Sequence, residues 1–209
     1  MTKWFLLLLM ALVSAPAALA QSSDYSRYEF YGGYAYQRTS NNAASIGTNG
    51  NVAVPGGIVH FDSRGQNFGG FTAEFNQNLN HRWGLVTSFT GVYDNAPVYA
   101  TSTPVRVKAS RYDLLFGPRY TLRLGRFIPF AEGMAGFEHM SVRIDGDFGK
   151  VVKGDTAFAM AVGGGVDVHV SHHFDIRAIQ ADYLPTFFNG THQNNYRVGA
   201  GVKLKIVDP

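Results

Sequence analysis

Short polar breaks and long polar breaks alternate along this chain, and the segments between them have the length of single β-strands. Antiparallel strands joined by short turns at one end and by long loops at the other form an up-and-down barrel. The layout therefore predicts an all-β chain with its turns at one end and its loops at the other. The short breaks are Asn78–Arg82, Leu122–Phe127 and Val170–His173, and the long ones are Thr39–Gln66, Asp94–Ala109, Ser141–Asp155 and Leu184–Asn194.

A period of two in hydrophobicity runs through the segments between the breaks. In Ser110–Thr121, for example, Leu114 and Phe116 alternate with Arg111 and Asp113. Successive residues of a strand point to opposite faces, so each segment has one apolar face and one polar face. Eight strands are predicted: Arg27–Arg38, Asn67–Gln77, Trp83–Tyr93, Ser110–Thr121, Ile128–Met140, Thr156–His169, Phe174–Tyr183 and Asn195–Ile206.

Three of these strands depart from simple alternation. The fifth and sixth are rich in small residues, and Asp167 shares a face with those of the sixth, which indicates a tight interior there. In the seventh, the polar residues change parity between Asp175 and Arg177 on one side and Gln180 on the other. A β-bulge near Ala178 would bring them back to one face.

The direction of the apolar face separates a membrane barrel from a soluble one. A soluble barrel of the lipocalin type turns its apolar face inward, whereas a membrane barrel turns it toward lipid. Tyrosines and phenylalanines gather near the strand ends, as interfacial girdles do, and the polar faces carry charges of both signs. We therefore expect an eight-stranded antiparallel transmembrane β-barrel, with its turns and both its ends in the periplasm and its long loops outside.

The first twenty residues are organised like a secretory signal peptide. Lys3 is basic, Trp4–Val13 is apolar, and Ala18-Leu19-Ala20 precedes the expected cleavage after Ala20. Residues 21–209 would then form one barrel domain in the outer membrane of a Gram-negative cell. The chain has no cysteine, which excludes a disulfide scaffold and a lipoprotein anchor. Its net charge of +3 is scattered, so no nucleic-acid surface is expected.

Charged residues on the predicted inward faces form the candidate site. Eight strands leave an interior just wide enough for side chains, so no open pore is expected. An unpaired charge in such an interior is strongly destabilising, so acids and bases should pair into a structural network. Its expected members are Glu29, Glu74, Arg111, Asp113, Arg119, Glu132, Glu138, Asp167, Arg177, Arg197 and Lys203.

Four motifs in this order resemble small outer-membrane barrels of the OmpA-like type. They are Tyr31-Gly32-Gly33-Tyr34-Ala35-Tyr36, Phe116-Gly117-Pro118-Arg119, Pro129-Phe130-Ala131-Glu132-Gly133 and Gly163-Gly164-Gly165-Val166-Asp167. The resemblance spans nearly all of residues 26–206. It implies an outer-membrane location and contact with outer-membrane lipid and lipopolysaccharide, and we expect a monomer.

The last predicted strand is similar to the signal that the barrel-assembly machinery reads. Arg197, Gly199, Val202 and Leu204 fit the pattern of a polar residue, a glycine and alternating apolar residues. The chain departs from the pattern in ending Ile206-Val207-Asp208-Pro209, without a terminal aromatic residue. The expected partners during biogenesis are this machinery and periplasmic chaperones.

Residues that could carry chemistry are few. His139 and Ser141 resemble the His-x-Ser pair of outer-membrane lipid A deacylases, in which histidine would deprotonate the serine hydroxyl. Val142 stands where that family has asparagine. The pair His172-His173 has no carboxylate or cysteine at metal-ligand spacing. We predict no catalytic residue, metal or cofactor.

The sequence leaves four functions open. The first is a non-enzymatic outer-membrane protein that stabilises the envelope or presents loops for adhesion, since loops carry function on such scaffolds. The expected loop Thr39–Gln66 is the longest of them. The alternatives are a narrow porin-like channel, a lipid A deacylase-like enzyme and a soluble lipocalin-like binder.

Overall fold

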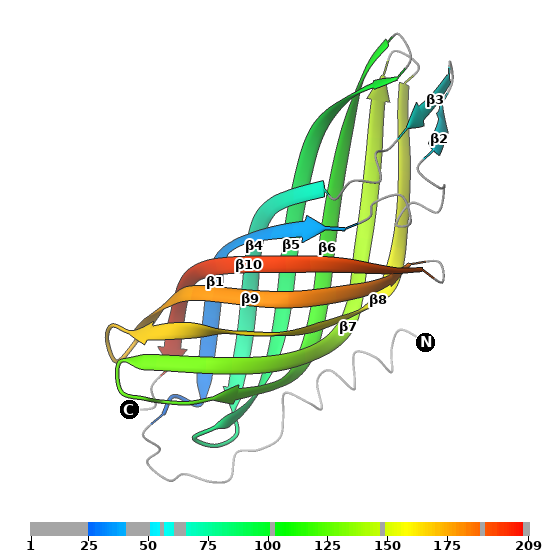
Figure 1. The fold of residues 1–209 in the computed structure, drawn as a ribbon. Coiled ribbons are helices and arrows are strands. Elements are labelled where there is room, and N and C mark those ends of the chain that lie inside the picture. Colours follow the sequence, from blue (N-terminus) through cyan, green and yellow to red (C-terminus); the bar gives the residue numbers. More distant parts are fainter. Residues whose placement is uncertain are drawn as a thin grey trace.

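The chain folds into a closed antiparallel barrel of eight strands in the order β1-β10-β9-β8-β7-β6-β5-β4, as predicted (Figure 1). This computed structural model describes residues 25–40, 51–54, 57–60, 66–100, 103–146, 149–188 and 191–206, so the expected signal peptide lies outside the described residues. The barrel strands are β1 Tyr28–Thr39, β4 Gln66–Asn78, β5 Trp83–Ala100, β6 Thr103–Thr121, β7 Phe127–Gly146, β8 Gly149–His169, β9 Phe174–Phe188 and β10 Thr191–Ile206. A separate hairpin consists of β2 Asn51–Val54 and β3 Gly57–His60.

The first strand closes the barrel because it pairs on both sides. Tyr34, for example, lies opposite Ala200 of β10 and opposite Phe71 of β4. Closure leaves no unpaired sheet edge around the wall, which is a requirement for backbone inside a bilayer. No helix in the described part of the chain is long and apolar enough to cross a membrane.

The apolar faces of the strands point outward. Tyr34, Leu114 and Val162 are 61%, 53% and 60% exposed, whereas the polar residues between such positions are buried in the lumen. This is the arrangement of a membrane barrel and the reverse of a soluble one. The lipocalin-like alternative is therefore wrong.

Aromatic side chains gather on the outer surface of the wall, near both of its ends. At the end with the short turns, the rings of Trp83 and Tyr120 are 5.0 Å apart. At the other end, the rings of Tyr93 and Tyr112 are 5.7 Å apart. Two such belts mark the water interfaces of a membrane protein and thus the limits of the lipid-facing band.

The β-bulge predicted near Ala178 is present. Val166 pairs with Ile179 and the next residue, Asp167, pairs with Arg177, so Ala178 has no partner in β8. Both Ala178 and Ile179 are exposed on the outer wall. The extra residue reverses the parity of β9, so the polar side chains on both sides of the bulge face the lumen.

The long predicted loops are shorter than expected, because the strands continue into them. β5 and β6 extend to Ala100 and Thr103, and β7 and β8 extend to Gly146 and Gly149. The prediction failed there for a physical reason: alternating hydrophobicity is required only inside the bilayer, whereas backbone pairing can continue beyond it. The remaining long segment, Thr39–Gln66, holds the β2–β3 hairpin.

Four strands project past the closed part of the wall. The β4–β5 ladder ends at Gly69 and Tyr93, and the β8–β9 ladder ends at Phe158 and Phe187. Beyond these rungs, β5, β6, β7 and β8 pair only with one another, and they rise above the rest of the barrel in Figure 1. We call this part the four-stranded extension. It consists of β5 after Tyr93, β8 before Phe158, and the segments of β6 and β7 that pair with them.

Candidate functional site

The structure places all of the predicted lumen charges on the inner face of the barrel. None of them is more than 5% exposed. They form two clusters. The first extends from the turn end of the barrel to its mid-height, and the second lies near the extension. These residues are Glu29, Glu74, Arg111, Asp113, Arg119, Glu132, Glu138, Asp167, Arg177, Arg197 and Lys203.

Arg177 of β9 lies at the centre of the first cluster and is fully buried. Its Nη1 is 2.7 Å from Glu74 Oε2, and its Nε is 2.8 Å from Asp167 Oδ1. The guanidinium also lies between two rings, 4.0 Å from the centroid of Tyr31 and 4.4 Å from that of Phe130. Opposite charges and aromatic faces together replace the water that the guanidinium loses on burial.

Arg119 joins the same cluster from the other side. It donates to Glu132 at 2.7 Å and to Glu74 at 2.5 Å, so Glu74 is shared by two arginines. The Gln180 amide donates to Glu74, Glu132 and Asp182 at 3.1, 2.8 and 3.1 Å. The carboxylates are thus held from strands on opposite sides of the lumen, which ties those strands together.

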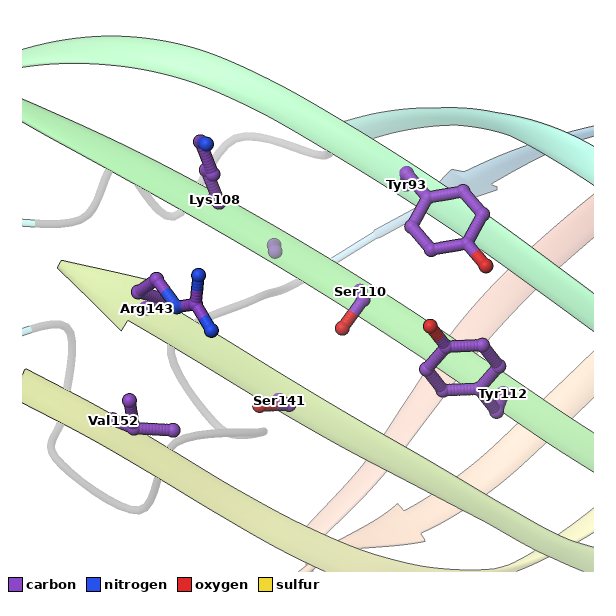
Figure 2. A pocket seen from close by; sticks show the side chains of 8 residues that line it. Tyr93, Lys108, Ser110, Tyr112, Ser141, Arg143 and Val152 are labelled. Carbon is purple, nitrogen blue, oxygen red and sulfur yellow. The ribbon is translucent and has the colours of Figure 1, made fainter. Parts of the chain in front are cut away.

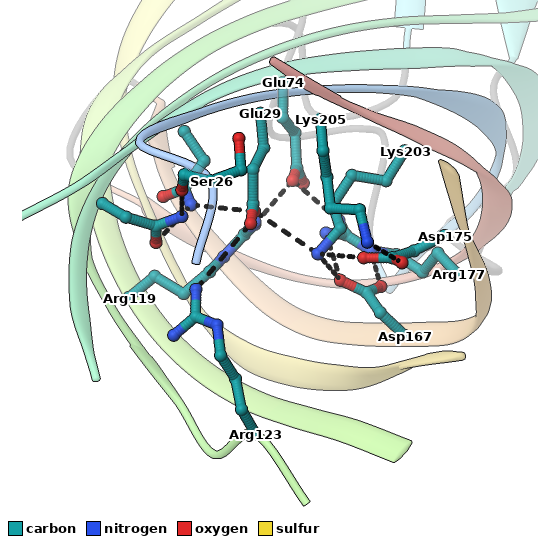
Figure 3. Close-up of polar contacts among 12 residues, drawn as sticks. Ser26, Glu29, Glu74, Arg119, Arg123, Asp167, Asp175, Arg177, Lys203 and Lys205 are labelled. Atoms are coloured by element: carbon teal, nitrogen blue, oxygen red, sulfur yellow. Dashed lines mark hydrogen bonds and ion pairs between the residues drawn. The ribbon is translucent and has the colours of Figure 1, made fainter. Parts of the chain in front are cut away.

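The turn end of the lumen is closed by lysines (Figure 3). Lys203 Nζ lies 3.3 Å from Glu29, 2.9 Å from Asp167 and 3.1 Å from Asp175. Lys205 Nζ reaches Asp175 at 2.6 Å. The interior is therefore paired down to the level of the short turns.

Arg123, in the turn between β6 and β7, covers this end of the lumen. Its Nη2 lies 3.7 Å from Glu29 Oε1, and its guanidinium carbon is 5.2 Å from the Tyr25 ring centroid. Burial lowers the pKa of Arg123 from its ordinary value, and the nearby Glu29 carboxylate opposes that shift. With so high an ordinary pKa, the guanidinium keeps its charge.

The second cluster lies toward the extension. Arg197 pairs with Asp113 at 3.1 Å and with Asp182 at 3.0 Å. Arg111 donates to Glu138 and to Gln193, each at 2.6 Å. The Arg111 guanidinium lies between the rings of Phe68 and Phe188, at 5.6 and 6.0 Å from their centroids. Two aromatic rings and a paired cation therefore occupy this end of the lumen.

Four aspartate, lysine and arginine partners of the network were not among the predicted members: Asp175, Asp182, Lys205 and Arg123. Asp175 and Asp182 are buried, and they lie on opposite sides of the bulge. Applying the bulge at Ala178 to the whole of β9 would have assigned both carboxylates to the lumen. Arg123 gave no comparable signal, because strand parity says nothing about a side chain in a turn.

The pair His139 and Ser141 lies on the outer wall of β7. His139 Nδ1 is 2.8 Å from Thr156 Oγ1, so its near partner is a threonine of β8. Glu138, the adjacent carboxylate, points into the lumen and is fully buried. Within the described residues, no cluster of three or more histidine, aspartate or glutamate side chains is placed to hold a metal ion.

An outward apolar wall, two aromatic belts and a charged, closed interior define an outer-membrane β-barrel. The family model of the outer membrane protein beta-barrel domain matches residues 5–203. The chain belongs to this family, and the family implies location in the outer membrane, in contact with its lipids. A search of curated proteins finds no match to the chain.

Solved structures of two bacterial proteins have a similar fold. The attachment invasion locus protein Ail of Yersinia pestis, in complex with the heparin analogue sucrose octasulfate, has a TM-score of 0.55 and 18% identity over 86% of this chain and 99% of its own. Neisserial surface protein A has a TM-score of 0.50 and 13% identity over 87% of this chain and 98% of its own. At these identities the likeness concerns the fold alone.

Proposed function

We propose that this chain is a non-enzymatic outer-membrane scaffold that presents its four-stranded extension to partners outside the cell, in an adhesion-like role. The observation that carries the proposal is the continuation of β5–β8 beyond the last rungs of the closed wall. These strands have 18 to 21 residues, whereas a tilted strand needs about 9–11 to cross the bilayer. The excess forms a paired, regular surface in water. The attachment invasion locus protein Ail has a similar fold, so a barrel of this architecture is compatible with such a role.

The paired lumen has a structural role in this proposal. Its charges link strands across the barrel, and the inward wall of β5–β9 carries the buried apolar residues Val86, Leu115, Met134 and Leu184. Neither feature offers a reacting group to a substrate. The described hydrogen bond of His139 goes to Thr156 rather than to Ser141, so it gives the deacylase alternative no support.

Export and assembly complete the proposal. Residues 1–20 would direct secretion and be removed after Ala20, with residues 21–209 remaining as the barrel domain. The barrel-assembly machinery would read β10, where Val202 and Leu204 face outward and Arg197 faces the lumen. The protein would function as a monomer.

Adhesion tests the proposed role. Bacteria of a non-adherent laboratory strain that express the chain should bind cultured epithelial cells several times more than bacteria with an empty vector. Replacing residues 96–107 and 145–150 with two-residue Asn-Gly turns should abolish the gain, because it removes the outermost rungs of both hairpins of the extension. Replacing residues 42–64 with a short linker is the matched control and should keep it. Loss of adhesion only in that control would assign adhesion to residues 42–64 instead of the extension. Equal adhesion of all strains, the empty-vector strain included, would reject the adhesion-like role.

The narrow-channel alternative makes a different prediction. The purified barrel in a planar lipid bilayer should give no stable conductance, because paired charges and aromatic rings fill the lumen at both ends. Single-channel recording at neutral pH measures this directly, with a large porin as positive control. Reproducible steps of uniform size from the wild-type chain would contradict it.

A further inference from the structure

A hollow of about 300 Å³ lies on the outer wall where the closed barrel meets the extension (Figure 2). Tyr93 and Tyr112 line one end of the hollow, and Lys108 and Arg143 line the other. Ser110 of β6 and Ser141 of β7 lie between these two ends and are direct cross-strand partners. The small side chains of the two serines leave the space open, and Gly154 opposite Ser141 adds no side chain.

The height of this hollow places it at the lipid headgroups. Tyr112 belongs to the aromatic belt at the outer end. Lys108 lies four residues before it in β6, on the side of the extension. The strand from Lys108 to Thr121 is longer than the roughly 9–11 residues that cross the hydrocarbon. The two cations therefore lie just outside the apolar core, while the tyrosines lie at its boundary.

The positive charges of Lys108 and Arg143 lie close enough to repel each other. Lys108 and Arg143 are direct cross-strand partners, and both side chains are exposed on the same outer face. Like charges in that position destabilise a sheet. In the lumen, by contrast, Lys203 meets three carboxylates. Among the described residues, neither Lys108 nor Arg143 has an ion-pair partner, so an external anion would relieve their repulsion.

We propose that this hollow binds a phosphate group of the outer-leaflet glycolipid, the lipid A part of lipopolysaccharide. Arginine presents a fork of N–H donors that matches phosphate, and lysine adds a compact charge. The Ser110 and Ser141 hydroxyls are placed to donate to the remaining phosphate oxygens. Tyr93 and Tyr112 would pack against the sugar and the start of the acyl chains. The hollow opens on the lipid-facing wall, which favours an anion anchored in the membrane. This inference does not depend on the proposed adhesion.

Native mass spectrometry of the full-length barrel in detergent tests the site. The probe is bisphosphorylated lipid A, compared with the same lipid after removal of its phosphates. We expect Lys108→Gln and Arg143→Gln each to weaken lipid A binding by about tenfold, since each variant loses a charge-assisted hydrogen bond to the phosphate. Arg38→Gln is the matched control, because Arg38 is an exposed cation near the outer end of β1. It should bind as the wild type does.

The outcomes are distinct. Preferential binding of the phosphorylated lipid, lost in both variants and retained in Arg38→Gln, supports the site. Equal binding of the two lipids, or equal binding by all variants, overturns it. Displacement of lipid A by inorganic phosphate at a similar concentration would assign the hollow to a free anion and overturn the lipid assignment. A heat-modifiable gel shift first establishes that each variant is folded, and the adhesion assay is scored separately.

Discussion

Replacing Arg177 with alanine should lower the unfolding temperature of the barrel by roughly 10 °C. The side chain is fully buried and pairs with Glu74 and Asp167 while lying between the rings of Tyr31 and Phe130. Removing one partner of a buried ion pair costs about 3–5 kcal/mol, because the remaining charge stays buried. The outer wall is unchanged, so we expect the variant still to reach the outer membrane. The heat-modifiable gel shift of the purified protein measures the transition.

Two further variants separate lost pairing from a general defect. Arg126→Ala removes an exposed arginine from the turn before β7 and should leave the transition unchanged. In the triple variant Arg177→Met, Glu74→Gln and Asp167→Asn, the cation and both carboxylates become neutral, and much of the stability should return. If the triple variant is no more stable than Arg177→Ala, unpaired charge is not the cause of the loss. An unchanged transition in Arg177→Ala itself would contradict a stabilising role for the network.

The barrel was predictable because the bilayer imposes a strict pattern on the sequence. Lipid on one side and a narrow polar lumen on the other require alternation, and strands such as Ser110–Thr121 carry it plainly. The bulge at Ala178 was also predictable, because an inward polar face was interrupted by a single residue. The four-stranded extension was not, because backbone pairing beyond the bilayer does not need an alternating sequence.

The sequence predicts that charged residues pair inside the lumen, but it does not predict which residues pair with which. Parity assigned Arg177 and Glu74 to the inner face, but these residues come from β9 and β4, which are not neighbours in the barrel. Their contact depends on the stagger of the strands and on barrel closure, which no single strand encodes. The hollow at Lys108 and Arg143 was missed for a related reason. Both residues were assigned to loops, so their cross-strand register could not be considered.

Gly117 should tolerate no side chain, although it lies in the middle of a strand. A Cβ at this position would overlap the carbonyl oxygen of Gly133 and lie 2.8 Å from the Met134 Cα, and both are backbone atoms of β7. The β6–β7 ladder has no paired residues between Phe116–Ala135 and Arg119–Glu132, where Pro118 lacks an N–H group. The two backbones approach closely there, and neither can move aside like a flexible side chain.

We therefore expect Gly117→Ala to destabilise the barrel by about 3 kcal/mol, the upper part of the range for overpacked cores. Separating β6 from β7 at this level would also disturb the Arg119–Glu132 pair in the next rung. Gly133→Ala is the matched control on the facing strand, since a Cβ there meets no atom within 4 Å. It should be neutral or stabilising by up to about 1 kcal/mol, because alanine loses less backbone freedom on folding than glycine. Urea unfolding of both variants in the same detergent measures the difference. Equal stability would mean that the β6–β7 contact at Gly117 can widen without loss, and that close backbone approach does not require glycine at this position.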